Sequence, residues 1–81
     1  MMHSIARLSP RRAYRKLARA LFTGGPCELP TSSGVLEFTV DMLQRSTDGV
    51  ITVVGHTPAG AAVNMTISAG RDIEIKVLPL P

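Results

Sequence analysis

The sequence predicts an α+β fold in which an N-terminal basic amphipathic helix packs on a four-stranded antiparallel β-meander. Apolar residues recur with a helical period within residues 10–22 and with a period of two in short segments from residue 35 onward. Charge is also divided, because six of the nine Lys and Arg residues lie in the first 22 positions and all six acidic residues lie beyond position 27. With 81 residues the chain has room for one small domain. We divide it into a basic arm (1–9), a helix (10–22), a linker (23–34) and an antiparallel β domain (35–78).

The helix is expected to begin at Ser9 and Pro10. A serine hydroxyl accepts a hydrogen bond from a free backbone N–H, and proline lacks the N–H that would go unused in the first turn. The predicted apolar stripe consists of Tyr14, Leu17, Ala18 and Leu21. The opposite side carries Arg12, Arg15, Lys16 and Arg19. Gly24, Gly25 and Pro26 are expected to end the helix.

The segment 28–34, with Pro30 and a run of Thr and Ser, has the composition of a linker. Four strands are then predicted, at residues 36–42, 50–54, 61–67 and 73–77. The turns between them contain glycine, and connections this short favour antiparallel neighbours. Pro79 and Pro81 are expected to stop further pairing, because neither can donate to a ladder.

Chain length and cysteine content indicate the oligomeric state and the cellular compartment to expect. Without the arm and the helix, about 60 residues remain to enclose a core, and a domain of that size buries only about 60% of its unfolded surface. We therefore expect a homodimer.

Cys27 is the single cysteine. We place it in a loop as an unreactive thiol, and a lone cysteine favours a reducing compartment. No apolar run is long enough to span a membrane, so we expect a cytoplasmic protein without a membrane partner. An organellar transit peptide is the alternative for the Arg-rich start.

No group of residues points to catalysis, a metal or a cofactor. His3 and His56 do not stand at metal-ligand spacing with another His, Cys or carboxylate, and His56 is placed in a solvated turn. Acidic residues at even spacing, such as Glu37 and Asp41, are typical of the solvent-exposed face of a strand. We therefore expect that the protein is not an enzyme and takes no cofactor.

The strongest functional signal is the cationic start of the chain. Residues 1–22 carry a formal charge of +6 and residues 23–81 a charge of −3. A cationic segment without acids attracts polyanions. The candidate contact residues on the helix and the arm are Arg7, Arg11, Arg12, Arg15, Lys16 and Arg19. Three alternatives stay open for them: the phosphates of a nucleic acid, the acidic surface of a larger host protein, and a solvated face.

The strand pattern also carries a likeness to a known family. The stretch from Val63 to Ile75 contains a valine, alternating apolar positions, an alanine at a turn and a basic residue followed by an acidic one. In these features residues 35–77 resemble the carbon storage regulator family, small dimeric β-proteins that bind messenger RNA. The resemblance implies a small antiparallel homodimer that binds RNA. Val40 stands where the family has an RNA-contacting arginine, and only Lys76 keeps a positive charge at the end of the last strand.

Together these patterns predict a small non-enzymatic regulatory protein that contacts nucleic acid, RNA in preference to DNA, through the basic helix. The alternative is a protein-interaction module or inhibitor, of the kind encoded by phages and mobile elements, that docks on a larger host protein.

Overall fold

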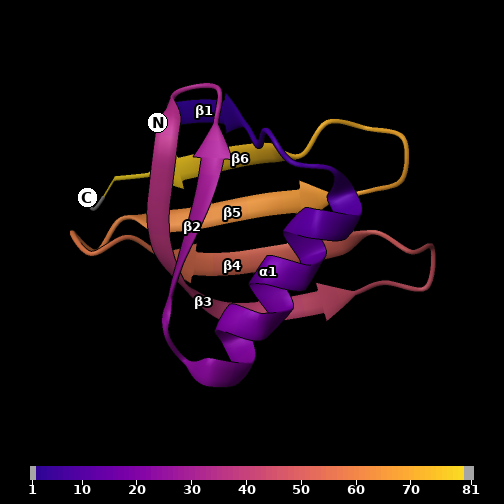
Figure 1. Ribbon diagram of the computed structural model, residues 1–81, viewed down its shortest axis with the longest axis horizontal. Helices are drawn as coiled ribbons and strands as arrows, with labels where there is room; N and C mark the ends of the chain where they lie inside the picture. Colours follow the sequence, from indigo (N-terminus) through magenta and orange to yellow (C-terminus); the bar gives the residue numbers. More distant parts are fainter. Residues whose placement is uncertain (1, 80–81) are drawn as a thin grey trace.

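One helix and six strands make up the fold in the computed structural model, which describes residues 2–79. Their bounds are β1 (Met2–Ile5), α1 (Pro10–Thr23), β2 (Pro26–Thr31), β3 (Gly34–Arg45), β4 (Ile51–His56), β5 (Ala62–Ile67) and β6 (Glu74–Leu78). All six strands form one antiparallel sheet in the order β1-β6-β5-β4-β3-β2. The sheet curls into a half-barrel, and the helix lies across its open side (Figure 1).

The predicted four-stranded meander with a covering helix is therefore wrong. The four predicted strands correspond to β3–β6 and pair in chain order, but β1 and β2 extend the sheet at its two ends. The extra strands allow the sheet to curl, and α1 contacts β2 and β3 at the opening of the curl. Pro79 follows β6, and Pro81 lies outside the described residues.

Both missed strands are edge strands, which explains why their sequences read differently. The predicted linker contains β2, whose Pro26 and Pro30 are tolerated because an edge strand need not donate a hydrogen bond on both sides. The predicted arm contains β1, which is only four residues long and pairs with β6 alone. The segment of β1 shows no regular alternation, whereas β2 alternates, with Cys27, Leu29 and Thr31 buried, but its prolines mask the pattern in the sequence.

The two ends of the sheet meet at one corner. Ala6, just after β1, forms an isolated antiparallel bridge with Thr31 at the end of β2. The Arg7 N–H donates to the carbonyl of Pro30 at 2.7 Å, and the Ser32 N–H donates to the carbonyl of Ile5 at 2.8 Å. These bonds tie the first strand to the second although the whole helix separates them in sequence.

A β-bulge at Asp41 bends the long strand β3. Val40 pairs with Gly55 and Met42 with Val54, so Asp41 is the extra residue between them. The first half of β3 runs with β2, and the second half turns to follow β4 (Figure 1). The bulge also reverses the alternation, which leaves Met42 46% exposed and turns Leu43 toward the core. The predicted strict alternation through Met42 is therefore wrong.

The core lies between the concave side of the sheet and the helix. Its largest fully buried side chains are Phe38, Leu17, Leu29, Met65, Ile73, Ile75, Val53 and Val63. Among the described residues no buried side-chain nitrogen or oxygen lacks a hydrogen-bond partner. Burial of these apolar side chains, at about 1.5–3 kcal/mol per fully buried large side chain, is the main favourable contribution to folding.

Gly55 has little room for a side chain. A Cβ at this position would lie 2.2 Å from the carbonyl oxygen of Thr39 and 3.3 Å from the Cδ2 atom of Phe38. The close approach follows from the bend of β3 over β4 beside the bulge.

We predict that Gly55→Ala lowers the free energy of unfolding by about 1–3 kcal/mol, because the strands must separate to accept the methyl group. Urea unfolding followed by circular dichroism measures the change. Gly25→Ala is the matched control, since the nearest atom to its Cβ would be Thr23 Oγ1 at 3.6 Å. Equal stability of the Gly55→Ala variant and the wild type would contradict the packing described here.

Candidate nucleic-acid interface

The helix presents its cations to solvent because small apolar residues anchor its other side. It begins after Ser9, whose hydroxyl accepts from the Arg12 N–H at 3.3 Å, and it ends at Gly24 in the left-handed conformation with φ 74°. Both ends agree with the prediction. The buried positions are Ala13, Leu17 and Ala20, a stripe rotated from the predicted one. Leu21 of the predicted stripe is exposed, because the contact with β2 and β3 is centred on the alanine side.

Five cationic side chains cover the outer side of the helix, and we call them the basic face. They are Arg11, Arg12, Arg15, Lys16 and Arg19, and all five residues are exposed. The helix has no acidic residue in its first turn. Within residues 2–79 the sole ion pair closer than 4.0 Å joins His56 to Asp41, so no carboxylate forms an ion pair with the basic face. Glu28 is near its C-terminal end, where it lines a pocket together with Lys16 and Arg19. Cations outside ion pairs attract an external anion.

Phe22 places an aromatic ring beside these cations. It follows Arg19 by three residues and Arg15 by seven, which puts all three on one side of a helix. Phe22 is 92% exposed, whereas an aromatic residue of a folded domain is normally well buried. The sequence interpretation assigned it no role, although its helical spacing from the two arginines is visible in the sequence.

A pocket of about 420 Å³ opens at the N-terminal half of the helix. It lies between α1 and the ends of β3 and β5, and Arg11 and Arg15 of the basic face belong to its lining. Arg45, at the end of β3, brings a third guanidinium group, with its Cζ 5.6 Å from the centre of the Tyr14 ring. Sequence reasoning missed Arg45, because only the bulge at Asp41 turns this position toward the helix.

The other two predicted contact residues stand apart from the basic face. Arg7 is exposed in the connection between β1 and α1, where its backbone N–H bonds to Pro30 and fixes its place near the start of the helix. Lys76 is exposed on β6 opposite His3, and its neighbour Ile75 is buried on the core side. Lys76 therefore points away from the concave side that holds the helix, and it does not join the basic face.

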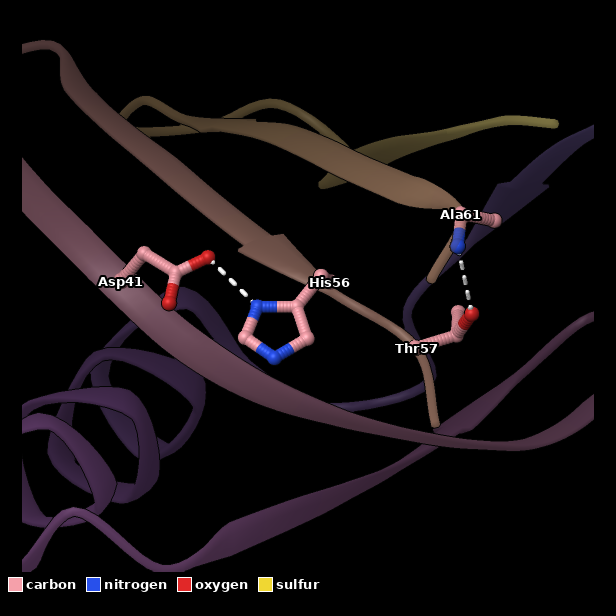
Figure 2. Close-up of polar contacts among 4 residues, drawn as sticks. All are labelled: Asp41, His56, Thr57 and Ala61. Atoms are coloured by element: carbon pink, nitrogen blue, oxygen red, sulfur yellow. Dashed lines mark hydrogen bonds and ion pairs between the residues drawn. The ribbon is translucent and has the colours of Figure 1, made fainter. Parts of the chain in front are cut away.

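His56 forms the one ion pair, but not from a turn as predicted. It is the last residue of β4, and its Nδ1 atom lies 2.7 Å from Oδ2 of Asp41 (Figure 2). The bulge moves Asp41 out of the regular ladder to face the ring. Thr57 then accepts from the Ala61 N–H at 3.0 Å and closes the following turn (Figure 2). Both members of the pair are about half-exposed, so the contact is a solvated one of small energetic weight.

No group of three or more His, Cys, Asp or Glu residues lies close enough to hold a metal ion within residues 2–79. Over the same range no helix has the length and apolar character needed to cross a membrane.

Comparison with protein-family models, with curated proteins and with solved structures finds no match to this chain.

Cys27 lies in β2 with its side chain in the core, and its predicted place in a loop is wrong. Burial raises the pKa of the thiol above its ordinary value, against an opposing attraction from Lys16 and with a further increase from Glu28. A higher pKa leaves less of the reactive thiolate at a given pH.

We predict that Cys27 of the folded protein reacts with iodoacetamide at least about tenfold more slowly than in urea at mildly alkaline pH, because the thiol is both shielded and less ionised. Mass spectrometry of quenched samples measures the rate as a function of pH. The native profile should be displaced to higher pH than the unfolded one. Equal rates in the two states would show that Cys27 is accessible.

Proposed function

We propose that this protein is a small non-enzymatic, cytoplasmic regulatory protein that binds single-stranded nucleic acid, RNA in preference to DNA, through the basic face of α1. The observation that carries the proposal is the set of five exposed cations without a carboxylate partner. Phosphate contacts from such a set supply affinity that does not depend on sequence.

The dimensions of the helix suit a strand of several nucleotides. Fourteen helical residues extend over about 21 Å, and the cations are distributed along most of that length. Arg and Lys side chains reach outward from the helix, so they can follow a flexible backbone without the regular geometry of a duplex.

An unpaired strand is favoured over a duplex by the exposed aromatic ring. Phe22 can stack on a base, which requires that the base is not enclosed in a double helix. The basic face has no Asn or Gln, the side chains that read adenine in a DNA major groove. These features support RNA loops or other single-stranded segments as the target class.

The same aromatic residue supports a second candidate function, in which the protein is an interaction module that docks on a larger host protein. An exposed Phe surrounded by Arg is a composition found at the energetic centres of protein interfaces. The complementary surface would be an acidic groove with an apolar pocket. Nuclease treatment of a native complex separates the candidates, because only a protein partner at fixed stoichiometry survives it.

We predict that Arg15→Gln with Arg19→Gln weakens binding to a short unstructured RNA and lowers the slope of log K against log salt by about 1.4, since each phosphate contact contributes about 0.7. Fluorescence anisotropy between about 50 and 200 mM salt measures both quantities.

Lys76→Gln is the control, because it removes a cation from the other side of the sheet. It should change the affinity and the slope much less than the double variant. Circular dichroism establishes that each variant is folded. RNA affinity that is independent of salt, or that survives neutralisation of the basic face, would refute nucleic-acid binding by this surface.

A further inference from the structure

The pocket at the N-terminal half of α1 combines apolar walls with a cationic rim. Tyr14, Ile51 and Ile67 supply the apolar side, and both isoleucines are buried in the core, which makes the floor rigid. Arg11, Arg15 and Arg45 supply the charge. A volume of about 420 Å³ lies within the range of about 300–1,000 Å³ that is usual for sites that hold small organic groups.

Tyr14 and Arg45 form a stack at this site. The guanidinium carbon lies 5.6 Å from the ring centre, which is within the range of a cation–π contact. Both groups are planar, and unpaired bases stack on aromatic rings and on arginine planes alike. The stack therefore offers a flat surface to a flat occupant.

The three arginines of the pocket limit the kind of ligand that it can hold. Three guanidinium groups disfavour a neutral aliphatic group and favour one that is joined to an anion. Arg11 and Arg15 belong to the pocket and to the basic face at once, so an occupant can continue into a chain of phosphates along the helix. A planar ring with an apolar face, joined through a sugar to a chain of phosphates, is the chemistry of a nucleotide within a strand.

We infer that this pocket accepts one nucleobase of the single strand whose phosphates lie on the basic face. The base lies against the Tyr14–Arg45 stack, while Arg11 and Arg15 hold the phosphates that flank it. This inference rests on the proposed function and adds to it a site that distinguishes bases from bare backbone.

The test compares a short unstructured RNA with an abasic sugar-phosphate polymer of the same length. The comparison is made in a Phe22→Ala background, for the parent and for both variants below, because the exposed Phe22 ring could stack on a base by itself. The parent should bind the RNA about tenfold more tightly, which corresponds to one base stacked in the pocket. Ala69→Leu adds an aliphatic side chain to an exposed position of the pocket lining and should bring the two affinities together. Arg45→Lys keeps the charge and removes the plane, so it should reduce the preference for RNA while the salt slope stays the same.

A second readout does not depend on any variant. Tyr14 is the only tyrosine, so selective isotope labelling of tyrosine gives a single set of ring-proton signals in NMR spectra. These protons should shift on addition of RNA and stay in place on addition of the abasic polymer.

The outcomes separate the inference from the proposed function. Equal binding of both polymers, or a base preference that persists in both variants with unshifted Tyr14 protons, overturns the pocket assignment and leaves phosphate binding intact. Failure of both polymers to bind refutes the proposed function itself. Movement of the Tyr14 signals by an acidic aromatic peptide but not by RNA would assign the pocket to a protein partner.

Discussion

Backbone hydrogen bonds between the end of β1 and the end of β2 hold the helix in its place. The bridge between Ala6 and Thr31 joins the residue after β1 to the last residue of β2, whereas the chain re-enters the sheet after the helix at Pro26, the other end of that strand. The helix must then fold back across the opening of the curl, where Leu17 completes the core. A small domain gains much from this arrangement, because a half-barrel without a covering element would leave its concave apolar side in water.

The anchoring of the helix also determines where its charges lie. Ala13 and Ala20 have small side chains that let the helix approach β2 and β3 closely, and the cations are left on the far side. Like charges repel one another along the basic face, and among the described residues no ion pair within 4.0 Å relieves this repulsion. Binding of a polyanion would remove this repulsion, so the segregation of charge stabilises the bound state more than the free one.

Local signals in the sequence predicted local structure well. Ser9 and Gly24 mark the ends of the helix, the apolar β-branched run at 50–54 identifies β4, and alternation identifies β5 and β6. The fold class was missed because it depends on long-range pairing. The prolines of β2 are typical of a linker, and only its pairing with β3 shows that the segment is a strand. The bulge at Asp41 has no local signal in the sequence. The cations of the helix were found from their spacing, whereas Arg45 joins them only through the bend of β3.

Pro26 and Pro30 influence how this sheet meets other molecules. The carbonyl of Pro30 accepts a hydrogen bond from the Arg7 N–H, so the backbone groups of Pro30 face away from β3. Pro26 lies four residues earlier on the same strand. Its backbone groups therefore face the same way. An incoming strand would find two missing donors along the outer border of β2. Stacking of copies into extended aggregates through that border is thereby discouraged, although the seam of the sheet is incompletely closed.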